Sequence, residues 1–115
     1  MLIITKIKPA ELYFLTHVIE RYQELAQAYL NELKPGSDRY FDIKLNQSVA
    51  IHLSHRLKKL NLKISPPSHY KMTLPQHEGI VLLNAIIVEQ SLQRISAFEV
   101  MISEKYKELL TRELL

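Results

Sequence analysis

Residues 6–11 read Lys-Ile-Lys-Pro-Ala-Glu, and residues 71–78 read Lys-Met-Thr-Leu-Pro-Gln-His-Glu. In each copy a short segment with lysine leads to a proline, then to a glutamate, and then into a long run rich in Leu, Ile and Val. A proline suits the first turn of a helix, where its missing N–H is not needed, and the helix dipole favours a glutamate in the same turn. The two copies therefore predict two strand-then-helix halves packed on each other. They can reflect an internal duplication, or only the frequency of the strand–proline–helix junction.

The composition is that of an ordinary soluble globular protein. Of the 115 residues, 47% are hydrophobic and 23% are charged, and there is no cysteine. This length predicts a single domain over residues 1–115, large enough to bury a core without disulfides or structural metals. No apolar run reaches the length of a membrane-spanning helix, and residues 1–7 lack the features of a signal peptide. We therefore expect a cytoplasmic protein, and the absence of cysteine fits a reducing compartment.

The first part of the chain predicts a strand, a long helix and a loop. Residues 2–7 are rich in β-branched side chains that alternate with a period of two, which is typical of a strand. Over residues 9–34 the apolar side chains recur three and four positions apart, which predicts a helix with one buried stripe. The members of this stripe are Leu12, Leu15, Ile19, Tyr22, Ala26, Tyr29 and Leu33. A proline–glycine pair then ends the helix, and residues 35–44 are expected to form a loop anchored by Tyr40 and Phe41.

A second helix and two short strands are expected in the middle of the chain. The helix covers residues 45–61, and the strands cover residues 62–65 and 69–74. The buried stripe expected on this helix consists of Leu45, Val49, Leu53, Leu57 and Leu60. Two consecutive prolines separate the two strands, because proline cannot sit in a central strand.

The last third of the chain contains no proline but is too long for one helix. Thr73 and Gln76 fit a capping box at the start of a third helix, and the apolar run Ile80–Val88 is typical of a helix buried on most sides. A single helix over this stretch would be about 55–60 Å long, which exceeds the diameter of a domain of this size. We therefore expect a break near residues 89–96 and a fourth helix over residues 97–113.

The net charge of +3 is concentrated in residues 35–63, which contain six basic residues and two acidic ones. On the second expected helix, basic side chains spaced three, one, three and four positions apart share one side. They are His52, His55, Arg56, Lys59 and Lys63. Such a face can contact phosphates and supply sequence-independent affinity for nucleic acid, or it can be a solvated helix face. In both cases Arg56 and Lys59 are expected to be exposed, so their replacement by alanine would barely change stability.

The sequence offers little support for catalysis or metal binding. His52 and His55 are one helical turn apart, but His77 is not followed by the second histidine that a zinc-protease helix requires. Two glycines in the whole chain exclude a P-loop and a dinucleotide-binding loop. The serines lack the setting of a nucleophile elbow. We therefore expect no enzymatic activity, no metal site and no cofactor.

Together these patterns predict a mostly helical α+β fold: a four-helix bundle-like domain with a small two- or three-stranded sheet. The short sheet has exposed edges, and the helices carry more apolar surface than one core needs. Our first hypothesis is therefore a non-catalytic protein–protein interaction module that acts as a homodimer or as an adaptor for another protein. The alternative is an accessory nucleic-acid-binding protein that uses the basic helix at residues 45–63. We expect no membrane and no small-molecule cofactor among its partners.

Overall fold

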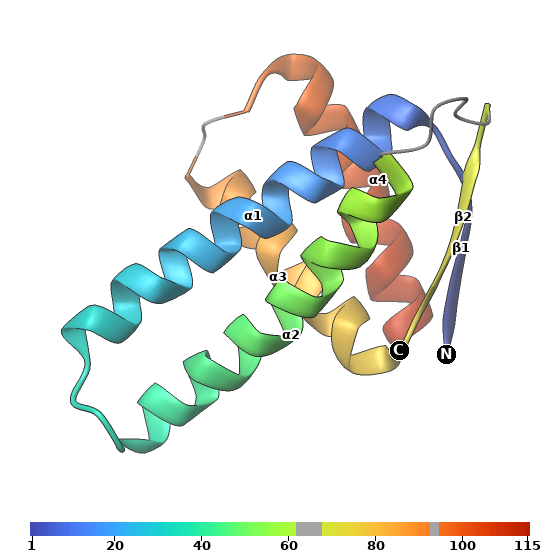
Figure 1. The fold of residues 1–115 in the computed structure, drawn as a ribbon. Coiled ribbons are helices and arrows are strands. Elements are labelled where there is room, and N and C mark those ends of the chain that lie inside the picture. The colour runs from blue at the N-terminus through green and yellow to red at the C-terminus, as the bar shows by residue number, and fades with distance from the viewer. Residues whose placement is uncertain (62–67, 93–94) are drawn as a thin grey trace.

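The computed structural model describes residues 1–61, 68–92 and 95–115. Within these residues the chain runs in the order β1 (Leu2–Ile7), α1 (Pro9–Glu32), α2 (Asp38–Asn61), β2 (Tyr70–Leu74), α3 (Gln76–Ser91) and α4 (Ala97–Leu114). For this part of the chain, the predicted mostly helical α+β class with four helices and a small sheet is confirmed (Figure 1). The strand expected at residues 62–65 lies outside the described residues.

β1 and β2 pair antiparallel as a two-stranded sheet within the described residues. The Cα pairs that set the register are Leu2–Leu74, Ile3–Thr73, Ile4–Met72 and Ile7–Tyr70. Between the last two pairs, β1 has Thr5 and Lys6 where β2 has only Lys71, so β1 carries a bulge there. Lys6 has a φ of 57°, in the left-handed region. One face of the sheet is buried against the helices, and the other faces away from α1–α4 (Figure 1).

α1 confirms the predicted buried stripe over most of its length. Leu15 and Ile19 are fully buried and Ala26 is buried, whereas Tyr29 near the end of the helix is exposed. The C-terminal half of α1 and the N-terminal half of α2 extend together beyond the other helices (Figure 1). The stripe is exposed at this end of α1 because neither α3 nor α4 covers it there.

α2 begins seven residues before its expected start, so the predicted loop over residues 35–44 is wrong. The hydroxyl of Ser37 accepts a hydrogen bond of 3.2 Å from a backbone N–H of the first turn, which favours helix at this point. Phe41 does not anchor a loop to the core, and Leu45 does not belong to a buried stripe. Both are exposed, Leu45 to 65%, because this end of α2 extends beyond α3 and α4. The later leucines of the stripe do pack in or against the core.

α3 and α4 are separate helices, as the length of the stretch required. The capping box predicted for Thr73 and Gln76 is wrong, because Thr73 belongs to β2 and Pro75 occupies the cap position of α3. At the start of α4, the N–H of Glu99 donates to the hydroxyl of Ser96, and the N–H of Ser96 donates to the carboxylate of Glu99. This reciprocal pair fixes where α4 begins.

The core is a cluster of buried apolar side chains contributed by both strands and by α1–α4. α3 supplies Leu82 and Ile86, which are fully buried, but Ile80 and Ile87 on another face are exposed. The expectation that α3 is buried on most sides is therefore wrong for that face. Within the described part of the chain, no helix combines the length and the apolar character that crossing a membrane requires.

Candidate functional site

Arg56 of the predicted basic stripe joins α2 to α3 and β2. Its Nη1 donates to Oε2 of Glu78 at 2.6 Å, and its Nη2 donates to the backbone carbonyl of Thr73 at 2.6 Å. Glu78 lies in the first turn of α3, and its side chain is buried. The other carboxylate oxygen, Oε1, accepts no hydrogen bond from the described residues. The expectation that Arg56 is an exposed, solvated charge is therefore wrong, because Arg56 is the principal partner of the buried Glu78 carboxylate.

Three other members of the basic stripe lie on the exposed side of α2. His52, His55 and Lys59 are exposed, with His52 Nε2 at 4.0 Å from Glu78 Oε1. Lys63 lies outside the described residues. Of the described members of the stripe, three are thus exposed on α2, and Lys59 is the lysine among them.

Glu11 at the start of α1 forms a second buried cluster, with α4. Its carboxylate accepts hydrogen bonds from the Lys105 ammonium (2.8 Å), the Tyr106 hydroxyl (2.9 Å) and the Lys8 N–H (3.0 Å). Burial raises the pKa of the Glu11 carboxyl, but these hydrogen bonds and the charge of Lys105 outweigh it and hold that pKa below its ordinary value. Burial, together with the adjacent carboxylate, raises the pKa of Tyr106. Glu11 is therefore ionised and Tyr106 is neutral at physiological pH.

The replacement Glu11→Gln should make the free energy of unfolding less dependent on pH in the acidic range. Because the folded pKa of Glu11 lies below its unfolded value of about 4.5, its carboxylate stabilises the fold above that pH and loses this effect as the pH falls through the lowered pKa. At neutral pH we expect a loss of about 1–3 kcal/mol. The difference from the unaltered protein should shrink in urea unfolding as the pH falls below about 4.5.

Glu24→Gln is the matched control, because Glu24 lies on the exposed side of the same helix. This variant removes the same charge at a solvated position, so its free energy of unfolding should stay close to that of the unaltered protein at every pH. If the two variants show the same pH dependence, the Glu11 cluster is not the source of the effect.

Glu89 near the end of α3 is also buried and pairs with Arg21 of α1. Three buried glutamates therefore each form an ion pair with a basic side chain of another helix. Glu11 links α1 to α4, Glu78 links α3 to α2, and Glu89 links α3 to α1. None of these three pairs was predicted from the sequence. The only available signal was the position of Glu11 and Glu78 after the two repeated prolines.

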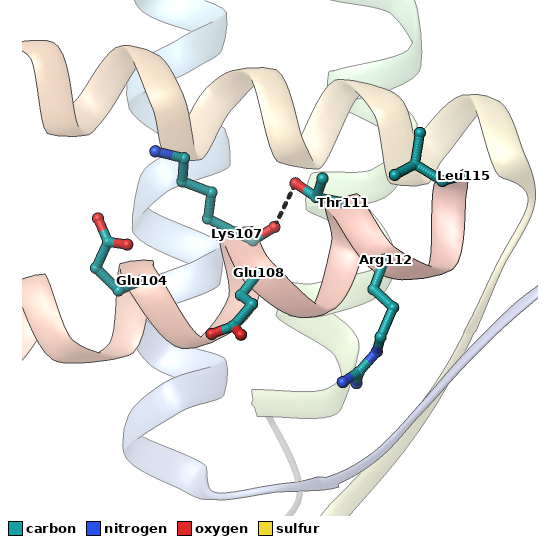
Figure 2. A pocket seen from close by; sticks show the side chains of 6 residues that line it. All are labelled: Glu104, Lys107, Glu108, Thr111, Arg112 and Leu115. Atoms are coloured by element: carbon teal, nitrogen blue, oxygen red, sulfur yellow. Dashed lines mark hydrogen bonds between the residues drawn. The ribbon is translucent and has the colours of Figure 1, made fainter.

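A wide concavity of about 510 Å³ on α4 does not bring together side chains that could act as a catalytic site. Its lining residues are Glu104, Lys107, Glu108, Thr111, Arg112 and Leu115. Figure 2 shows Lys107 and Thr111 pointing to one side of the helix, while Glu108 and Arg112 point to the other. The Thr111 hydroxyl is used locally, donating to the Lys107 carbonyl at 2.7 Å. Within residues 1–61, 68–92 and 95–115, no group of His, Asp and Glu side chains is arranged to hold a metal ion.

An exposed apolar surface lies where α4 meets the start of α1. Phe98 and Met101 are one turn apart on α4 and are 60% and 73% exposed. With Ala10 of α1 they line a concavity of about 280 Å³, which has Lys8 and Lys105 among its other lining residues. We refer to Ala10, Phe98 and Met101 as the α1–α4 surface.

Comparison of this chain with protein-family models, with curated proteins and with solved structures found no match. The contacts and surfaces described above are therefore the grounds for proposing a function.

Proposed function

We propose that this chain is a non-catalytic protein–protein interaction module that acts as a homodimer, with a second copy bound at the α1–α4 surface. The exposure of Phe98 and Met101 is the observation that carries the proposal. Apolar side chains that remain exposed beside a concavity are typical of a site for another protein. Phenylalanine and methionine are also enriched at such interfaces, and methionine adapts its shape to a partner.

A second copy of the chain is a suitable partner because a two-fold interface uses the same surface on both copies. Phe98 of one copy can enter the concavity of the other, which removes apolar area of both copies from water. The stems of Lys8 and Lys105 can cover the rim while their ammonium groups stay in water.

The buried charges support a binding function over a catalytic one. The carboxylates of Glu11, Glu78 and Glu89 are held by bases from neighbouring helices, so they fix the relative positions of the helices. All three are buried, so none of them is an exposed carboxyl group that could reach a substrate as a general acid. The α1–α4 surface instead offers exposed apolar side chains beside a concavity.

Light scattering after size exclusion tests the proposal. We expect a mass of about twice the 13.5 kDa of one chain in concentrated protein. Met101→Lys should shift the protein to monomer, because a charge would lie in the apolar interface. Its melting temperature when dilute should stay nearly unchanged, because Met101 is exposed in the monomer.

Leu45→Lys is the matched control, because Leu45 is 65% exposed on α2. It places the same charge on an equally exposed helix position away from the α1–α4 surface and should leave the dimer intact. A mass near 13.5 kDa for the concentrated unaltered protein would refute the homodimer. Dissociation by Leu45→Lys but not by Met101→Lys would move the interface to α2.

We also propose that the chain is a single domain built from two copies of an internal repeat. Its helices pack as a bundle. The order β1–α1–α2 is followed by the order β2–α3–α4. Glu11 and Glu78 are each the third residue of the helix that follows a strand. Their partners are reciprocal, because Glu11 of the first half binds Lys105 on the last helix of the second half, and Glu78 binds Arg56 on the last helix of the first half. An approximate two-fold axis through the centre of the sheet would produce this exchange.

A further inference from the structure

The outer face of the two-stranded sheet is basic and uncovered by helices α1–α4 (Figure 1). Its exposed or half-buried side chains are Ile3, Thr5, Lys6, Lys71 and Thr73. We refer to these residues as the ribbon face. Residues 1–8 and 68–75, which contain both strands, include no aspartate or glutamate. Neither Lys6 nor Lys71 forms an ion pair with any residue that the structure describes.

The bulge of β1 concentrates this positive charge at an unfavourable position. Thr5 and Lys6 share the register position opposite Lys71, so the two strands each place an exposed lysine at this position. Like charges that face each other across a sheet are destabilising. Lys6 also has a φ of 57°, which non-glycine residues adopt infrequently. Bulges of this kind re-aim side chains and are over-represented next to functional sites. Two lysines at one register position and a positive φ at Lys6, with no ion pair to either lysine among the described residues, favour a ligand that supplies negative charge.

We propose that the ribbon face binds double-stranded DNA. The major groove of B-DNA, about 12 Å wide, admits a two-stranded β-ribbon, and neighbouring strands lie about 4.8 Å apart. Lys6 and Lys71 would contact phosphates or guanine edges, which removes their mutual repulsion. The hydroxyls of Thr5 and Thr73 suit hydrogen bonds to base edges, and Ile3 suits contact with a thymine methyl group.

The ribbon face has a stronger claim to nucleic acid than the basic stripe on α2. Arg56 is bound to Glu78, and Lys58 beside the stripe is paired with Glu20 at 3.3 Å. Lys59 is the lysine of the stripe that is exposed among the described residues. The ribbon face instead carries two exposed lysines that form no ion pair with any described residue.

The binding of a short fluorescent DNA duplex, followed by anisotropy over a series of salt concentrations, tests this proposal. Lys71→Ala should weaken binding severalfold and reduce the slope of log affinity against log salt by about one. Lys6→Gly should weaken binding in the same way, yet it should preserve or raise the melting temperature, because glycine adopts positive φ without strain. This combination separates a loss of binding from a loss of folding.

Lys59→Ala is the matched control, since it removes an exposed lysine from α2 and should leave the affinity nearly unchanged. A duplex RNA of the same sequence should bind more weakly than the DNA, because side chains cannot reach into the narrow major groove of A-form helices. The proposal is overturned if the unaltered protein does not bind the DNA duplex, or if Lys59→Ala weakens binding as much as Lys71→Ala. It is also overturned if RNA duplexes or vesicles of anionic lipid bind as tightly as DNA, or if Lys6→Gly leaves the affinity unchanged.

Discussion

The replacement Arg56→Met should lower the free energy of unfolding by about 3–5 kcal/mol at neutral pH. Glu78 keeps its carboxylate buried in the first turn of α3, and Arg56 holds it through a hydrogen bond of 2.6 Å. Without the guanidinium, the buried carboxylate would lose its hydrogen-bonded base, leaving only His52 at 4.0 Å among the described basic residues, and the carbonyl of Thr73 would lose this donor as well. Urea unfolding followed by circular dichroism measures the difference.

Two further variants separate the ion pair from simple loss of packing. In the double variant Arg56→Met with Glu78→Gln the buried charge is absent, so most of the lost stability should return. Lys59→Ala, one turn further along α2 and exposed, should change the free energy of unfolding by less than about 0.5 kcal/mol. Equal losses for Arg56→Met and Lys59→Ala, or no recovery in the double variant, would show that the pair does not hold α2 and α3 together.

The replacement Ile19→Asp should leave the protein largely unfolded at room temperature. Ile19 is fully buried in the centre of α1, where an aspartate would be a charge without a partner. We expect a loss of more than about 4 kcal/mol, a large share of the roughly 5–15 kcal/mol that stabilises a domain. Circular dichroism over a thermal scan should show reduced helix at 25 °C and no cooperative transition.

Tyr29→Asp on the same helix is the control for this prediction. Tyr29 is exposed, so the same added charge should cost less than about 1 kcal/mol there. A thermal midpoint for Ile19→Asp within about 2 °C of the unaltered protein would mean that the stripe on α1 is not buried.

The sequence predicted the elements whose signals are local and repeated. The spacing of Leu15, Ile19 and Ala26 predicted α1, because an a/d stripe on one helix indicates its buried side without knowledge of the partner. The break between α3 and α4 followed from length, because one helix of that extent does not fit in a domain of this size. The strands followed from alternation and from their flanking prolines.

The start of α2 could not be predicted from the same signals. Phe41 and Leu45 are apolar but exposed, so they do not continue the buried stripe that marks the later turns. The hydrogen bond to Ser37 that favours helix at this point is a weak sequence signal, because serine is common in loops as well. Whether such residues are buried depends on how far α3 and α4 extend along α1 and α2, which is a property of the tertiary structure.

The roles of the charged residues depend on tertiary position even more strongly. Arg56 and Lys59 lie one turn apart on α2, but Arg56 reaches a buried carboxylate and Lys59 stays in solvent. Spacing along one helix cannot distinguish them, because the difference comes from the position of Glu78 on α3. The same holds for Phe98 and Met101, which sequence patterning alone does not assign to a surface.

The central claim is that a second copy covers the α1–α4 surface, and the oxidation of methionine by peroxide tests it most directly. The chain provides its own controls, because Met1 is 84% exposed and Met72 is buried, while Met101 lies at the proposed interface. Mass spectrometry can follow the conversion of each methionine to its sulfoxide in dilute and in concentrated protein. We predict that Met101 reacts nearly as fast as Met1 in dilute protein and much more slowly in concentrated protein, whereas Met1 and Met72 keep their rates. A rate for Met101 that does not depend on protein concentration would contradict the account.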